Sequence, residues 1–230
     1  ELTEPTRYFS ILEAIAGGAT RRNEIAGVTG IDYNQLSTYL DRLSRLRLIE
    51  RHVPVTEKPE RSKRSQYRLQ DPLFRFWFRF LYGGSDRYDQ FGDEAYERLV
   101  EPEMADFVAP AFEQLCCDAL WTLYDETPIV DVGQWWYQDH EIDVVGLIDE
   151  DTLVVGECKY QESPLDYSAL GSLETHVEEL RWQPSGGGTR TVEYALFSRS
   201  GFTDSIRDVA AERDDLRLYT IDDVVTALRE

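Results

Sequence analysis

Residues 141–160 read EIDVVGLIDEDTLVVGECKY, and this stretch decides the fold. Two runs rich in Val, Ile and Leu, at residues 142–148 and 152–159, flank a polar turn at residues 149–151. Apolar runs on either side of a short polar turn are typical of a β-hairpin. The second run is apolar on both of its faces through residues 153–156, which indicates a central strand covered on both sides.

The register of this hairpin brings charged residues together. If Ile148 faces Thr152, Asp143 lies directly opposite Glu157. Directly opposed residues have Cβ atoms about 5 Å apart, and two like charges at that distance destabilise a sheet unless a cation lies between them. Lys159 follows Glu157 at the two-residue period of a strand and therefore projects from the same face. The sequence thus predicts a cluster of two acids and a lysine.

A simpler interpretation of these charges stays open. A solvated hairpin face could carry Glu141 and Lys159 as an ordinary cross-strand ion pair, which would contribute little stability. Against this interpretation, the strand that holds Lys159 is apolar on both faces, and charges placed in such a strand need partners.

Composition and charge divide the chain. The 230 residues carry a net charge of −20, and Asp and Glu total 44, a balance that predicts a halophilic source. Residues 1–82 hold 14 Lys and Arg against 10 Asp and Glu, whereas residues 83–230 hold 10 against 34, and this shift predicts two domains. No run of 18 apolar residues occurs, so we expect a cytoplasmic protein without a membrane partner. The three cysteines have no metal-ligand spacing, and we expect reduced buried thiols.

Residues 1–70 have the pattern of a winged helix-turn-helix domain. Apolar residues at helical spacing predict a helix that ends at Gly17, a short helix at 21–28 and a longer helix at 33–46, followed by a β-ribbon. Basic residues on the third helix and at the ribbon tip suit phosphate contacts on duplex DNA. These candidates are Arg42, Lys58, Arg61, Lys63 and Arg64. Winged helices also serve as protein-docking modules or spacers.

Residues 71–102 predict an aromatic helical connector. Asp71 as N-cap and Pro72 at the first helical position begin an aromatic-rich helix that runs to residue 82. A second helix is expected at 90–100. A platform for base stacking is the alternative role of the aromatic helix.

Residues 103–230 predict a mixed β-sheet flanked by helices, an α/β (α+β) domain. Around the hairpin the pattern gives helices and further strands in alternation. The predicted helices are 105–123, 167–182, 204–212 and 222–228, and the predicted strands beyond the hairpin are 191–200 and 216–220.

The charged residues of the hairpin carry a family resemblance. Asp143, a gap of 13 residues, and the sequence ECK at 157–159, with Glu113 on an upstream helix, resemble the motif of the PD-(D/E)xK nuclease superfamily. The later sequence YALFSRSGF is similar to the Mrr-type, restriction-endonuclease-like branch. The succession of winged helix, aromatic helix and GECKY hairpin resembles the C-terminal region of archaeal DEXX-box ATPases. Ile142 stands where the superfamily name has proline.

This resemblance implies metal-dependent hydrolysis of DNA, double-stranded or branched. Asp143, Glu157 and the backbone carbonyl of Cys158 would bind Mg²⁺ or Mn²⁺. Lys159 would orient or help deprotonate the attacking water and stabilise the phosphate, and Glu113 could hold a second metal or a water. Because no GxxxxGK[ST] motif occurs in the sequence, the implied ATPase domain would lie upstream or on a partner chain.

Two other functions stay open. The C-terminal domain could be an inactive nuclease fold kept as a DNA-binding or regulatory scaffold. Alternatively, the chain could be a winged-helix transcriptional regulator whose C-terminal domain binds a protein or a small ligand.

Overall fold

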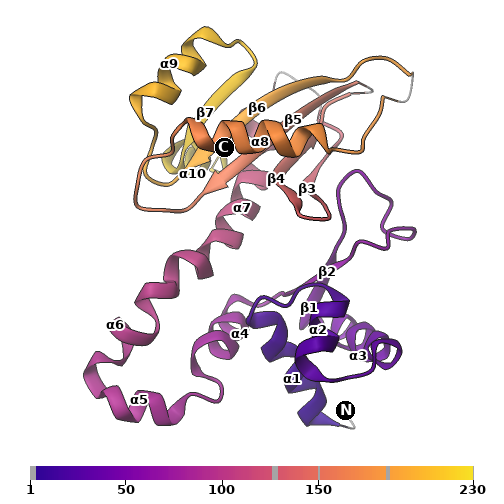
Figure 1. Cartoon of the computed structure of the whole chain (residues 1–230), viewed down its shortest axis with the longest axis vertical. Helices are drawn as coiled ribbons and strands as arrows, with labels where there is room; N and C mark the ends of the chain where they lie inside the picture. Colours follow the sequence, from indigo (N-terminus) through magenta and orange to yellow (C-terminus); the bar gives the residue numbers. More distant parts are fainter. Residues whose placement is uncertain (1–3, 126–128, 150, 185–186, 230) are drawn as a thin grey trace. The chain divides into compact units, whose positions relative to one another are not determined.

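The computed structural model describes residues 4–125, 129–149, 151–184 and 187–229, which form two compact units. The first unit comprises Glu1–Val53 and Pro59–Met104, and the second comprises Pro54–Lys58 and Ala105–Glu230 (Figure 1). The aromatic segment therefore groups with the N-terminal helices, and a short piece of the wing groups with the C-terminal sheet.

The first unit contains the predicted winged helix-turn-helix. Its elements are α1 (Pro5–Ala16), α2 (Arg22–Thr29), α3 (Tyr33–Arg45), β1 (Ile49–His52) and β2 (Gln66–Leu69). The Asp32 side chain begins α3, because it accepts hydrogen bonds from the backbone N–H groups of Asn34 and Gln35. The predicted inward stripe of α3 is confirmed, since Leu36, Leu40 and Leu43 are completely buried. Strands β1 and β2 pair antiparallel to form the wing.

The aromatic segment differs from the predicted pair of helices. Asp71 caps α4 (Pro72–Phe76) as expected, but the chain continues as a π-helix, η1 (Trp77–Leu81). The single helix predicted at 90–100 is wrong, because Gly92 at φ 51° ends the preceding helix. The chain there forms α5 (Ser85–Phe91), η2 (Gly92–Glu94), α6 (Ala95–Leu99) and η3 (Glu101–Glu103).

The second unit is a mixed five-stranded sheet between two layers of helices. The strand order is β3-β4-β5-β6-β7, antiparallel from β3 to β5 and parallel from β5 to β7. The strands are β3 (Asp131–Tyr137), β4 (His140–Leu147), β5 (Thr152–Lys159), β6 (Thr191–Ser198) and β7 (Leu216–Thr220). The helices are α7 (Met104–Leu123), α8 (Tyr167–Glu178), α9 (Asp204–Glu212) and α10 (Ile221–Ala227). Within the described ranges, no helix has both the length and the apolar content needed to cross a membrane.

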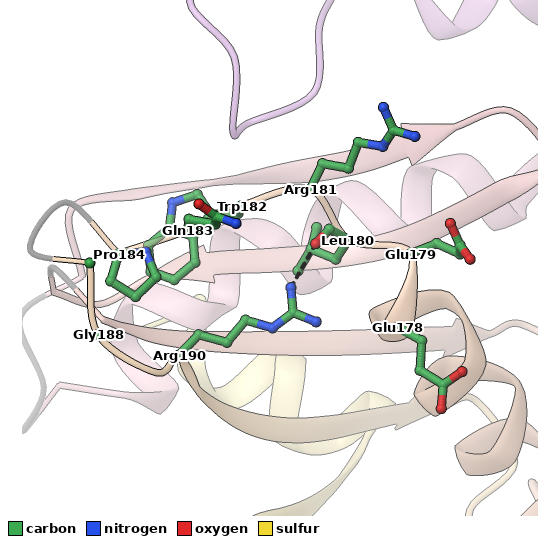
Figure 2. A pocket seen from close by; sticks show the side chains of 10 residues that line it. Glu178, Glu179, Leu180, Arg181, Trp182, Gln183, Pro184, Gly188 and Arg190 are labelled. Carbon is green, nitrogen blue, oxygen red and sulfur yellow. Dashed lines mark hydrogen bonds between the residues drawn. The ribbon is translucent and has the colours of Figure 1, made fainter.

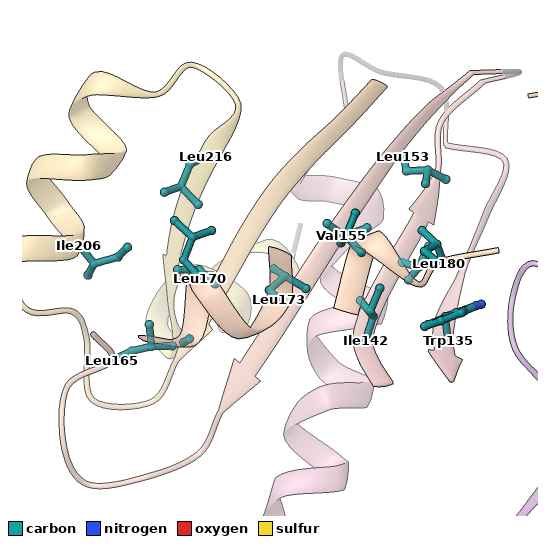
Figure 3. Packing of buried hydrophobic residues seen from close by; sticks show 14 of the residues in the cluster. Trp135, Ile142, Leu153, Val155, Leu165, Leu170, Leu173, Leu180, Ile206 and Leu216 are labelled. Atoms are coloured by element: carbon teal, nitrogen blue, oxygen red, sulfur yellow. The ribbon is translucent and has the colours of Figure 1, made fainter. Parts of the chain in front are cut away.

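Two apolar clusters cover the two faces of the sheet. On one face, Leu170 and Leu173 of α8 and Ile206 of α9 pack with Val155 and Leu153 of β5 (Figure 3). On the other face, residues of α7 and α10 pack against β4, β5 and β6; they include Phe112, Leu120, Val224, Val144, Val154 and Phe197. Strand β5 is therefore central and covered on both faces, as its sequence predicts.

The predicted hairpin register is confirmed over four pairs. Val144 pairs with Gly156, and the ladder continues in step to Leu147 and Leu153. The Ile148 N–H then donates to the Thr152 carbonyl at 3.1 Å. Of the predicted turn at 149–151, Glu150 lies outside the described residues.

Two features of this unit depart from the sequence prediction. Strand β3 was not predicted beyond an aromatic lead into the hairpin, so the sheet has one strand more than expected. Helix α8 ends at Glu178 instead of residue 182. A residue distant in the sequence stabilises this helix end, because the Arg190 guanidinium donates to the carbonyls of Val177 and Leu180.

Gly156 provides a test of this packing. A Cβ at that position would lie 2.9 Å from the Phe197 ring and 3.1 Å from both the Ala195 carbonyl oxygen and Val144 Cβ. We therefore expect Gly156→Ala to lower the free energy of unfolding by roughly 1–3 kcal/mol, as overpacked cores do. Gly171→Ala in α8 is the control, because a Cβ there meets nothing within 4 Å and should stabilise the helix. Denaturant unfolding of both variants checks this, and equal midpoints would contradict it.

Candidate active site

A β-bulge shapes the amino end of β4. Gly133 pairs with Val145, whereas Trp135 pairs with Ile142, so β4 advances three residues while β3 advances two. Asp143 and Val144 together therefore oppose a single residue of β3. Because of this extra residue, Ile142 and Val145 both reach the same apolar cluster, although strict alternation would place them on opposite faces.

Asp143 leaves the regular ladder at this bulge. The last backbone pair of β4 and β5 is Val144 with Gly156, and the Asp143 carboxylate then accepts a hydrogen bond from the Cys158 backbone N–H at 2.9 Å. The Asp143 carbonyl accepts from the Cys117 thiol at 3.5 Å. Both the carbonyl and the carboxylate of Asp143 are therefore hydrogen-bonded. The carboxylate accepts from a backbone N–H that would otherwise pair with the backbone of β4.

Glu157 and Lys159 complete the hairpin part of the cluster. Glu157 is 9% exposed, and its carboxylate forms an ion pair with the Lys159 ammonium group. The ion pair of Lys159 is therefore with Glu157 and not with Glu141, whose backbone N–H donates to His176. Lys159 lies at the carboxyl end of the central strand, and Asp143 lies at the amino end of its antiparallel neighbour, so all three side chains occupy one edge of the sheet.

Glu113 joins these residues from α7. The Gln134 side-chain amide donates to the Glu113 carboxylate at 2.8 Å. Gln134 is 9% exposed and is the β3 residue that faces the bulge. The sequence gives no signal for Gln134, because its role depends on strand β3 and on a partner 21 residues away.

The electrostatics of the cluster disfavour a charge on Asp143. Burial raises the pKa of Asp143 well above its usual value, and the nearby carboxylates of Glu157 and Glu113 raise it further. Burial alone would lower the pKa of Lys159, but its hydrogen bond with Glu157 and the charges of Glu157 and Asp143 raise this pKa overall. Lys159 therefore stays protonated at neutral pH.

The thiols beside Asp143 are structural. All three cysteines are free and buried. Burial raises the pKa values of the Cys117 and Cys158 thiols, which keeps both protonated and unreactive. The reduced state that the sequence predicts is confirmed.

The donor set suits a hard cation that keeps much of its water. Among the residues that the structure describes, no three His, Cys, Asp or Glu side chains are grouped closely enough to enclose a metal. Mg²⁺ in phosphate chemistry is commonly held by one or two carboxylates, with water and substrate oxygens in its other positions. Asp143, whose ionisation the Glu157 carboxylate disfavours, fits this open kind of site together with Glu157.

The predicted phosphate contacts lie on the first unit and the wing. Lys58, Arg61 and Lys63 are exposed, whereas Arg42 and Arg64 are half-buried. Arg51 organises the tip, because its guanidinium donates to Ser65 Oγ and to the carbonyls of Pro59 and Ser62. The exposed side of α3 includes Tyr33, Asn34, Gln35 and Thr38.

A cavity of about 920 Å³ has none of the carboxylate cluster in its lining. Figure 2 shows the side chains that line it. The described residues that line it are 178–184, 187–188 and 190, at the end of α8 and the loop that follows. The Arg190 guanidinium donates to two carbonyl groups, and the other charged residues of the lining are Glu178, Glu179 and Arg181. This cavity holds none of the residues that the sequence predicts to be functional.

The comparisons with known proteins agree with the expected archaeal kinship. A family described as "Archaea bacterial proteins of unknown function" matches residues 77–172, a range that contains all four residues of the cluster. The chain is similar to a family without a known function. It is also 30% identical over 155 residues to an uncharacterized protein, MJECL04, of Methanocaldococcus jannaschii. That match covers 66% of this chain but only 35% of the relative, which is much longer.

Asp143 offers a test of the electrostatics. Because its pKa is raised in the folded state, the unfolding free energy should fall as pH rises from the ordinary carboxyl range toward that raised pKa. Asp143→Asn keeps the acceptor for Cys158 but removes the charge. In the presence of a chelator at neutral pH, we expect this variant to be more stable than the parent, because it has no carboxyl group that ionises on unfolding.

Asp149→Asn is the matched control in the same hairpin. The backbone N–H groups of Asp151 and Thr152 lower the pKa of Asp149, so its ionised form is favoured and the substitution should bring no gain. Thermal unfolding across the pH range compares the two variants. If Asp143→Asn is no more stable relative to the parent than Asp149→Asn is, the neighbouring carboxylates do not raise the free-energy cost of ionising Asp143.

Proposed function

We propose that this chain hydrolyses DNA phosphodiester bonds with a divalent metal at Asp143 and Glu157 and with Lys159 beside the reacting phosphate. The observation that carries the proposal is the environment of Asp143. A bulge brings its carboxylate among two further carboxylates and a lysine at one sheet edge, where burial opposes its ionisation. Strongly perturbed carboxylates beside a specific charge partner are typical of functional sites.

The residues divide the chemical work between them. Asp143 and Glu157, with the Cys158 carbonyl, would hold Mg²⁺ or Mn²⁺, which when bound supplies Lewis acidity and an activated water. Lys159, protonated at neutral pH, would stabilise the negative charge that develops on the phosphate. Glu113, oriented by the Gln134 amide, would position a water or a second cation. The raised pKa of Lys159 favours this electrostatic role over that of a general base.

A specific observation supports a second candidate, an inactive nuclease fold that binds DNA. Lys159 already pairs with Glu157, so the lysine alone could neutralise the cluster without a metal. In that case the site would be a relic that stabilises the hairpin, and the winged helix would carry the function. The proposed partners are then DNA and an ATPase domain on the same or another chain, since the longer relative has sequence beyond this match.

Metal binding and cleavage test the two candidates. With Mn²⁺ or Mg²⁺, we expect the melting temperature of the parent to rise, because a cation relieves the repulsion between Asp143 and Glu157. Asp143→Ala and Glu157→Ala should show no such rise. Lys159→Ala should keep the rise but lose DNA cleavage by about 10²-fold or more, since lysine acts on the phosphate and not on the cation.

Glu141→Ala controls for nonspecific binding of cations to the acidic surface. Glu141 is an exposed carboxylate of the same strand, and its variant should respond to metal as the parent does. An equal thermal shift in all variants would place the cation elsewhere. Metal binding without any cleavage by the parent, on plasmid or branched DNA, would favour the inactive fold.

The basic wing is expected to supply DNA affinity. Replacing the exposed Lys58, Arg61 and Lys63 by alanine should weaken binding equally for all sequences. The slope of log affinity against log salt should flatten by about 2.7, at about 0.9 per lost phosphate contact. The measurement is a titration over the lowest salt range in which the protein stays folded. As a control, replacing the exposed Arg87, Arg98 and Arg229 by alanine removes the same amount of charge elsewhere. If the wing variant and this control variant give the same slope, the wing is a spacer and not a DNA contact.

A further inference from the structure

An arginine lies next to Lys159 at the carboxyl end of the parallel strands. Strands β5 and β6 run in register to their last pair, Lys159 with Ser198, and Arg199 follows directly. The Arg199 backbone N–H donates to the Lys159 carbonyl at 3.1 Å. Adjacent strands lie about 4.8 Å apart, so Lys159 and Arg199 start from neighbouring backbone positions at the same end of the sheet.

The Arg199 side chain is held on an aromatic support. Its guanidinium carbon lies 4.7 Å from the centre of the Tyr160 ring. The Tyr160 ring in turn contacts the ring of Phe112, at 5.6 Å between centroids, and Phe112 directly precedes Glu113 in α7. Stacking on a tyrosine restrains the plane of a guanidinium but leaves its N–H donors open to a ligand.

The two loops that carry this pair are fastened together. The Ser200 hydroxyl donates to the Gln161 carbonyl at 2.6 Å, and the Ser198 hydroxyl donates to the Gly201 carbonyl at 2.7 Å. The first bond joins the loop after β5 to the loop after β6 next to Arg199, and the second closes the loop after β6.

Arg199 differs from Arg213 and Arg217 of the second unit in its charge environment. Residues 83–230 contain 34 Asp and Glu, and Arg213 and Arg217 form ion pairs with such carboxylates. Arg199 is exposed, and over the described part of the chain its guanidinium forms no ion pair with a carboxylate. An exposed cation without a carboxylate partner is therefore available beside the reactive cluster.

We propose that Arg199, supported by Tyr160, binds a phosphate of the nucleic-acid strand next to the phosphate at Lys159. The inference rests on the proposed function, because Lys159 locates the reacting phosphate. A guanidinium fork donates two hydrogen bonds to a phosphate, which sets the direction of the strand across the sheet edge. One exposed contact holds a free phosphate only weakly, so the site is suited to a polymer that makes many such contacts.

Binding of a short labelled DNA duplex to the whole chain without divalent metal tests this inference. We expect Arg199→Ala to weaken binding about tenfold at low salt and to flatten the slope of log affinity against log salt by about 0.9, the value for one phosphate. Arg199→Lys should keep the slope and recover part of the affinity. Inorganic phosphate should displace the DNA no better than chloride at the same ionic strength.

Arg217→Ala is the matched control. Arg217 also lies over a tyrosine ring, that of Tyr124 at 4.5 Å, but it pairs with Glu193 and stands inside β7. Its variant loses the same charge and the same kind of stacking, and should bind as the parent does. Melting temperatures of all variants show that each is folded.

The outcomes separate this inference from the proposed function. If Arg199→Ala and Arg217→Ala give equal slopes and affinities, the inference fails even when the parent cleaves DNA. If the parent binds DNA without cleaving it, and only Arg199→Ala flattens the slope of log affinity against log salt, the result supports the phosphate site and contradicts the proposed hydrolysis. A parent that does not bind DNA overturns both. In a parent that cleaves, Arg199→Ala should raise KM by about the same tenfold with kcat nearly unchanged.

Discussion

One extra residue in β4 determines what the hairpin can do. Without the bulge, Asp143 would continue the ladder as an ordinary strand residue, and either Ile142 or Val145 would turn away from the apolar cluster that both now join. With the bulge, both residues stay in the core, and the backbone ladder between β4 and β5 ends at Val144, next to Asp143. The carboxyl group can then accept a hydrogen bond from the Cys158 amide, which fixes this group among other carboxylates at the edge of the sheet. Bulges next to active sites commonly redirect a side chain in this way.

The hairpin register could be predicted from the sequence because two independent constraints fix it. A three-residue turn sets one pair of opposed residues, and a shift by one position would turn every side chain of one strand, the charged ones included, to the opposite face of the sheet. The confirmed pairing of Val144 with Gly156 follows from these constraints. The bulge could not be predicted in the same way, because it requires no particular residue type. It appears only once β3 is placed beside β4, and the segment with Gly133 and Gln134 lacks the alternation that would have marked β3 as a strand.

Other errors share a physical cause, which is that distant residues decide local structure. The sequence pattern continues α8 to residue 182, but Arg190 binds the carbonyls of Val177 and Leu180 and ends the helix earlier. The orientation of Glu113 depends on an amide from another element, so the helical pattern alone does not determine what its carboxylate contacts. Local signals succeeded where the partner is close in sequence. The Asp71 cap of α4 is an example.

The acidic composition constrains how any polyanion could be held. At low salt, the carboxylates of residues 83–230 repel phosphates over about 10 Å or more, whereas at molar salt the screening length shrinks to about 3 Å. In a halophilic setting the long-range repulsion is therefore removed, but so is most of the gain from counterion release. Recognition must then depend on contacts at hydrogen-bonding distance. A fixed guanidinium suits this regime better than a flexible lysine, because its planar fork is already oriented and less conformational entropy is lost on binding. The scarcity of lysine, with only Lys58, Lys63 and Lys159 in the chain, follows the same physical logic.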